Sequence, residues 1–140
     1  MTAPETNSSP PRVFITNEKL RNGDTDQQGH INNAKIATFF ESGRVEVLAD
    51  AVLAAGARDV IFVVVRIEID FKKELFYPGT VEVRSQVVHV GNSSFRFAQS
   101  LLSGEDEVAA GTATCVLMDR ETRKPVAVPP AMRAFFGAPA

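Results

Sequence analysis

Residues 21–33 read Arg-Asn-Gly-Asp-Thr-Asp-Gln-Gln-Gly-His-Ile-Asn-Asn, and a helical pattern follows them at once. Asn32 or Asn33 is a good N-cap residue, because a short amide side chain can accept hydrogen bonds from the free N–H groups of a helix start. The apolar spacing predicts a helix over residues 33–55 that ends at Gly56. An acid beside a helix start favours acyl transfer, since the amides can polarise a carbonyl that the acid attacks or to which it directs water.

The remainder of the chain is predicted to be a sheet. Five strands are expected, over residues 13–20, 60–71, 80–90, 93–103 and 107–119. Short turn sequences join the last three strands, which favours antiparallel pairing. One long helix across an antiparallel sheet of about five strands is an α+β arrangement. Residues 131–136 are expected to add one or two helical turns.

Length and composition limit the classes of function. The 140 residues fit a flexible leader over residues 1–11 and one domain over residues 12–140. A net charge of −2 with scattered Lys and Arg does not favour nucleic-acid binding. No run approaches the roughly 20 apolar residues that span a bilayer, and no secretory signal is apparent. A cytoplasmic protein is therefore expected. The single cysteine, Cys115, excludes an internal disulfide and a cysteine-rich zinc site, which is compatible with a reducing cytoplasm.

Three groups of residues carry a resemblance to a known family. They are Asp24-Thr25-Asp26, then Gly29-His30-Ile31-Asn32-Asn33, and Phe39-Phe40-Glu41 with Arg44. Together they closely resemble the 4-hydroxybenzoyl-CoA thioesterase-like branch of the hotdog-fold acyl-CoA thioesterases, over about residues 13–130. The resemblance implies a sheet wrapped around the central helix, and hydrolysis of an acyl-CoA, or of an acyl carrier protein thioester, to a free acid and a thiol. It also implies no metal or redox cofactor, and a homodimer or homotetramer with active sites between subunits.

The resemblance further implies roles for single residues. Asp26 occupies the position of the catalytic carboxylate, a nucleophile or a general base on water, and Asp24 is expected to fix the loop. The backbone amide of Asn33 is the expected oxyanion donor. His30 either contacts the substrate carbonyl or water, or braces the loop. Glu41 is the alternative carboxylate, because some related hotdog enzymes use a helix glutamate; otherwise it is expected to form a modest surface pair with the arginine three residues later.

Contacts to substrate and CoA are harder to assign from sequence. Ser94 either contacts water, substrate or CoA, or stabilises a turn. Arg66 and Lys72 are candidates for the CoA phosphates, although basic side chains are equally common on a solvated sheet edge. Four phenylalanines could line an acyl pocket or simply fill the core: Phe39, Phe40, Phe62 and Phe76.

Two rival functions stay open. A hotdog domain can bind acyl-CoA without turnover, as a sensor, although no DNA-binding segment accompanies it here. A hotdog hydratase or dehydratase is possible by fold, but its Asp and His would be expected on a differently patterned loop and helix. The chain has no Gly-x-Ser-x-Gly, Gly-x-Gly-x-x-Gly or Walker sequence, which argues against a serine hydrolase, a dinucleotide-binding enzyme and an NTPase.

Overall fold

The computed structural model describes residues 11–137. The leader expected over residues 1–11 therefore lies, except for Pro11, outside the described residues. Every predicted element is present, and no end differs from its prediction by more than one residue. In chain order the elements are β1 (Phe14–Lys19), the 3-10 turn η1 (Asn22–Asp24), α1 (Asn33–Ala55), β2 (Val60–Phe71), β3 (Thr80–Val90), β4 (Ser94–Ser103), β5 (Asp106–Asp119) and α2 (Pro130–Phe136).

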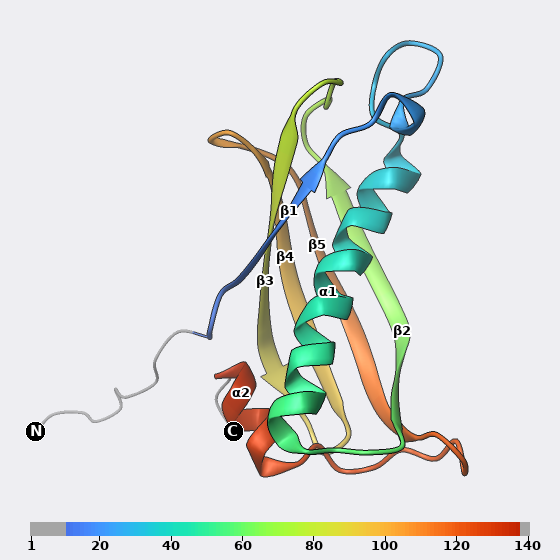
Figure 1. Ribbon diagram of the computed structural model, residues 1–140, viewed down its shortest axis with the longest axis vertical. Coiled ribbons are helices and arrows are strands. Elements are labelled where there is room, and N and C mark those ends of the chain that lie inside the picture. The colour runs from blue at the N-terminus through green and yellow to red at the C-terminus, as the bar shows by residue number, and fades with distance from the viewer. Residues whose placement is uncertain (1–10, 138–140) are drawn as a thin grey trace, which may run out of the picture.

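Helix α1 begins and ends where its capping residues predict. The Asn32 side chain accepts a hydrogen bond from the Ala34 amide at 2.9 Å, so Asn32 is the N-cap. At the other end Gly56 adopts a left-handed conformation with φ 61°, which glycine allows at little cost. The helix crosses the sheet diagonally (Figure 1).

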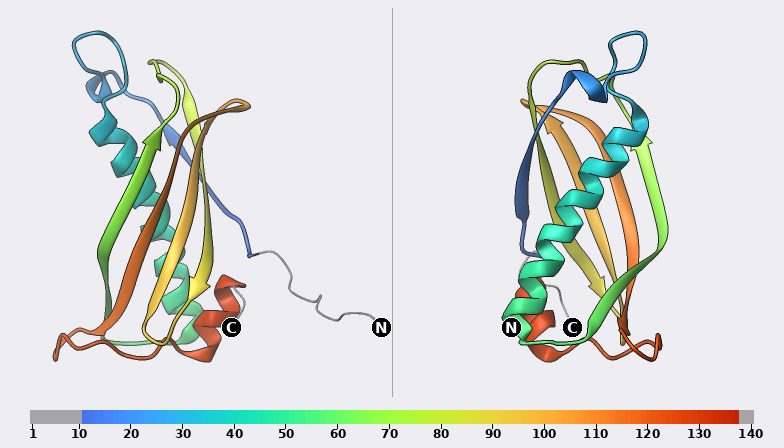
Figure 2. Two further views of the ribbon diagram at one scale, coloured as in Figure 1. Left: turned by 180° about the vertical axis from the view of Figure 1, so that it is seen from behind. Right: turned by 45° about the vertical axis from the view of Figure 1, so that its right-hand side comes forward.

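The five strands form one antiparallel sheet in the order β1-β3-β4-β5-β2. Tight turns join β3 to β4 and β4 to β5, as predicted, whereas β2 lies beside β5, which is distant from it in sequence. Strands β1 and β2 are the two edges, and they lie on either side of α1 (Figure 2). The helix thus occupies the hollow of the sheet, as the resemblance implied.

Two apolar clusters pack α1 against the sheet. The first surrounds the N-terminal half of the helix and contains Ile36, Phe40 and Leu101. The second surrounds the C-terminal half, where Met132 and Phe136 of α2 complete it. This packing holds the start of α1 rigidly above one end of the sheet, which positions the loop that precedes it.

A buried polar network lies beneath the middle of α1. Arg44 donates to Gln99 at 2.9 Å, and the amide of Gln99 donates to the Phe40 carbonyl and to the Ser85 hydroxyl. The predicted surface pair between Arg44 and Glu41 is therefore wrong. Arg44 faces the sheet because its position on the helix belongs to the buried stripe, whereas Glu41 is exposed.

Candidate active site

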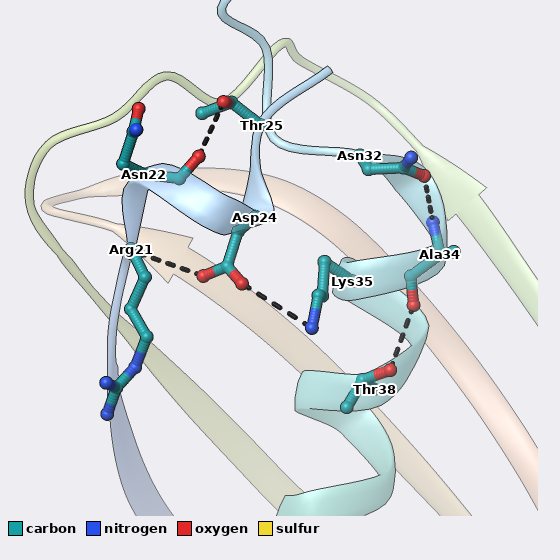
Figure 3. A network of polar contacts seen from close by, with 8 residues as sticks. All are labelled: Arg21, Asn22, Asp24, Thr25, Asn32, Ala34, Lys35 and Thr38. Atoms are coloured by element: carbon teal, nitrogen blue, oxygen red, sulfur yellow. Dashed lines mark hydrogen bonds and ion pairs between the residues drawn. The ribbon is translucent and has the colours of Figure 1, made fainter.

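The loop before α1 is fixed at both ends by Asp24. Its carboxylate accepts a hydrogen bond from the Arg21 amide at 2.9 Å and lies 3.6 Å from the Lys35 amine (Figure 3). Its carbonyl accepts a hydrogen bond from the Asn32 amide at 2.9 Å. The side chain is buried, and these contacts confirm that Asp24 fixes the loop.

Asp26 closes the turn that follows. Its Oδ1 accepts hydrogen bonds from the amides of Gln28 at 2.9 Å and His30 at 3.0 Å, and its own amide donates to the His30 carbonyl. Gly29 supplies the left-handed conformation, φ 87°, that this turn requires. No residue within 11–137 donates a hydrogen bond to Oδ2. The carboxylate is therefore held in place through one oxygen while the other is free for chemistry.

A cavity of about 480 Å³ lies between the start of α1 and the segment after β2. Asp26 and Asn33 line it on the helix side, and Phe71, Lys72 and Leu75 line it on the other. The amide of Asn33, at the first helical position, donates to no acceptor within the described residues, and it stands at the positive end of the helix dipole. The cavity is thus lined by one residue with a free carboxylate oxygen and one with a free amide, a combination that suits attack on a carbonyl.

His30 pairs with a residue that the sequence did not single out. Its Nε2 lies 3.0 Å from a carboxylate oxygen of Glu74, and its ring meets the edge of Phe76 at a centroid distance of 4.8 Å. The Ile31 amide donates to the Leu75 carbonyl at 2.7 Å, so the two segments are joined by backbone as well. Nothing in the sequence of the segment after β2 marked Glu74 as the partner of the histidine.

Only one of the three candidate contacts to substrate or CoA reaches this cavity within one chain. Lys72 lines it, and its amine lies 2.6 Å from Glu107. This hydrogen bond raises the pKa of Lys72 and, together with the Ser100 hydroxyl, lowers the pKa of Glu107.

The other two candidates lie elsewhere on the sheet. Arg66 is on the edge strand, 3.2 Å from Glu68. Ser94 pairs with Val116, whereas Phe71 of the cavity pairs with Ala109 of the same strand, so the two ends are separated by about 23 Å. A single chain therefore does not bring Ser94 or Arg66 to Asp26.

The four phenylalanines do not line the cavity. Phe39 and Phe40 are buried in the core, Phe76 packs on His30, and Phe62 lines a different groove. Phe39 and Phe40 therefore fill the core, which was one of the two alternatives, and do not line the cavity. The aromatic residue that does line it is Phe71. Within residues 11–137 no three His, Cys, Asp or Glu side chains gather into a candidate metal site.

The comparisons with known proteins agree with this geometry. A family model described as the thioesterase-like superfamily matches residues 20–136. The chain belongs to this superfamily. The long-chain acyl-CoA thioesterase FadM of Escherichia coli (strain K12) is 29% identical over 117 residues, which cover 81% of this chain and 89% of FadM.

Solved structures of thioesterases share the fold of this chain. A predicted thioesterase from Bacillus stearothermophilus is 26% identical with a TM-score of 0.78, and the match covers 89% of this chain and 94% of that one. The probable thioesterase YbaW from Escherichia coli is 26% identical with a TM-score of 0.76, covering 88% and 96%.

These matches confirm the predicted family and the α+β hotdog fold. Membership of the thioesterase-like superfamily supports thioester hydrolysis as the activity of this chain. In the part of the chain that the structure describes, neither helix is both long and apolar enough to cross a membrane.

Proposed function

We propose that this protein hydrolyses acyl-CoA thioesters to a free carboxylic acid and CoA, with Asp26 as the catalytic carboxylate. The observation that carries the proposal is the shared cavity: Asp26 and Asn33 both line it, and within residues 11–137 the Oδ2 of Asp26 and the amide of Asn33 have no hydrogen-bond partner. The name of the relative FadM, a long-chain acyl-CoA thioesterase, supports CoA as the thiol and an aliphatic acyl group.

In the proposed reaction the thioester carbonyl oxygen accepts a hydrogen bond from the Asn33 amide. This donor strengthens as negative charge develops on that oxygen, and loss of one such donor costs about 10²–10³ in rate. Asp26 either removes a proton from the attacking water or attacks the carbonyl carbon itself. In the second route an anhydride forms, CoA leaves as the thiolate, and water then hydrolyses the anhydride to regenerate the carboxylate.

The roles of His30 and Lys72 follow from their contacts. The contact of its Nε2 with a Glu74 carboxylate oxygen holds the His30 ring, and the His30 amide holds Asp26, so we assign His30 to bracing the carboxylate. Lys72 stands at the rim of the cavity as the candidate contact to a CoA phosphate, in competition with Glu107. The proposed chemistry uses a carboxylate, water and a backbone amide, and calls for no metal or redox cofactor.

We further propose a homodimer in the cytoplasm, formed through strand β2. This strand is a sheet edge twelve residues long, and its Val64, Val65 and Ile67 are exposed large apolar side chains. A long apolar edge strand is a ready template for pairing with another chain. Because the strands run antiparallel, pairing of two β2 strands would bring Ser94 of one copy toward the half of the interface that holds the other copy's cavity, whereas Arg66 would lie at the middle of the interface.

Thiol release from a panel of short, medium, long and aromatic acyl-CoAs, and from an acyl carrier protein thioester, tests the proposal. Asp26→Asn should lower kcat by about 10²–10⁴, since it removes the free oxygen's basicity but keeps the acceptor that holds the loop. The matched control is Asp50→Asn, which changes an exposed aspartate of α1 far from the cavity and should leave kcat at the wild-type value.

The outcomes separate the candidate functions. Binding of these thioesters without thiol release by wild type would favour the sensor. Equal turnover by wild type and Asp26→Asn would show that Asp26 is the wrong carboxylate, and Glu41→Gln would then be measured. Faster turnover of the carrier protein thioester than of every acyl-CoA would change the assigned thiol.

A further inference from the structure

Arg44 is a buried cation that the charge of Glu41 on the same helix attracts without forming an ion pair. Its side chain is 5% exposed, and its Nη1 donates to the neutral amide of Gln99 at 2.9 Å. Among residues 11–137 no carboxylate lies within ion-pair distance of it. Burial lowers the pKa of Arg44, which is the expected response of a desolvated guanidinium. Burying a charge is costly unless a partner charge compensates it.

The rest of the guanidinium faces a groove. This groove, about 660 Å³ in volume, lies between α1 and β2, and its walls include Leu48, Phe62 and Val64 as well as Glu41 and Arg44. Within the described residues the one fully buried side-chain polar atom without a partner is Thr16 Oγ1, so the unbonded N–H groups of Arg44 are open to this groove. Glu41 lies at the same groove, is exposed, and forms no hydrogen bond or ion pair within residues 11–137.

The second observation is where Glu41 and Arg44 lie along helix α1. Strand β2 can pair with its copy around a two-fold axis only in antiparallel fashion, and full-length pairing of Val60–Phe71 places the axis between Val65 and Arg66. Helix α1 runs alongside β2 in the opposite direction, since Ile36 shares a cavity with Phe71 and Val52 shares the groove with Val60.

Arg44 is the middle residue of α1 (Asn33–Ala55), and so it lies level with the middle of β2, where such an axis would pass. Glu41 lies three residues earlier, within about one helical turn of 5.4 Å. Two copies related by the axis would thus bring two arginines and two glutamates together with alternating charge. The surface is self-complementary in charge, because each copy supplies one cation and one anion to the same place.

We propose that the occupant of this groove is a second copy of the chain, whose Glu41 carboxylate pairs with Arg44 of the first copy, and reciprocally. This inference rests on the homodimer of the proposed function and names the contact that closes it. The partner also covers the exposed apolar side chains along the groove, Val45 of the helix and Val64 of the strand. The two reciprocal pairs compensate both buried guanidinium groups.

A charge-exchange experiment on the full chain tests this pairing. Glu41→Arg and Arg44→Glu are prepared separately with different affinity tags, and the dimer dissociation constant of each is measured by analytical ultracentrifugation over a dilution series. Each variant alone juxtaposes like charges, so its dissociation constant should rise by about 10²-fold or more. Mixing the two variants restores opposite charges at both contacts, so a heterodimer should form with near wild-type affinity.

The matched control is Glu46→Arg, the same charge change on another exposed glutamate of α1. Glu46 faces Glu18 of β1 rather than the groove, and it should leave the dissociation constant unchanged. Circular dichroism checks that each variant is folded. If Arg44→Glu does not fold, Glu41→Arg and Glu41→Gln still test the pair, because Glu41 makes no hydrogen bond or ion pair within the described chain.

Unchanged dimerisation by folded Glu41→Arg, or a mixture that remains two separate species, would overturn the proposal. So would a wild type that stays monomeric at all concentrations and binds a fatty-acid carboxylate at Arg44 instead. This experiment measures dimer formation, whereas the Asp26→Asn experiment measures thiol release. A failure of the Glu41–Arg44 contact is therefore distinguishable from a failure of the thioesterase proposal.

Discussion

Replacing Gly43 with alanine should destabilise the fold, although alanine is the better helix former. A Cβ at this position would lie 2.9 Å from Val83 Cγ1, and 3.3 Å from both Gln99 Nε2 and Ser85 Oγ. The helix preference for alanine contributes about 1 kcal/mol in favour of the variant. Overpacking costs about 1–3 kcal/mol. Displacing the Gln99 amide from the Phe40 carbonyl and the Ser85 hydroxyl costs about 1–3 kcal/mol more.

The expected net loss in the free energy of unfolding is therefore about 1–5 kcal/mol. Urea denaturation followed by circular dichroism, at equal protein concentration, measures it as a lower midpoint with an unchanged slope. Gly23→Ala is the matched control, because a Cβ there would meet no heavy atom within 4 Å, and it should be neutral or slightly stabilising. A Gly43→Ala protein as stable as wild type would refute the reasoning, since α1 could then move away from the sheet at no cost.

Four further predictions concern single side chains. Asn32→Ala should lower the free energy of unfolding by about 1 kcal/mol through loss of the cap, whereas Asn32→Asp should not; equal urea midpoints would contradict this. Asp26→Ala should unfold more readily than Asp26→Asn by about 1 kcal/mol, because only Asn keeps an acceptor for the two loop amides; thermal unfolding compares them. Lys72→Met should raise the pKa of Glu107, as the lost hydrogen bond is the main cause of its lowered pKa; an unmoved NMR titration would reject the pair. Burial raises the pKa of Cys115 from 9.0 to about 11. The unfolded thiol therefore ionises first, and the free energy of unfolding should fall by about 1.4 kcal/mol per pH unit between those values, a slope that Cys115→Ala should lack in urea titrations.

Much of the secondary structure could be predicted because its signals are local. Asn32 and Gly56 mark both ends of α1, and turn sequences mark the β3-β4-β5 hairpins. The loop aspartates were found because their motif is contiguous. Local signals could not show that Arg44 turns into the core, because burial depends on which helix face meets the sheet. They could not show the pairing of His30 with Glu74 either, since the two residues meet only after β2 has packed beside β5.

The place of β2 beside β5 also has a consequence during synthesis. Strand β2 leaves the ribosome directly after α1, but its hydrogen-bonding neighbour comprises Asp106–Asp119. At about 5–20 residues per second, several seconds pass before that neighbour is translated. Throughout this interval the run Val60–Val65, apolar at every position, has no native strand to pair with. Nascent chains are therefore most exposed to misassociation at β2, and chaperone binding to this segment would protect them until β5 emerges.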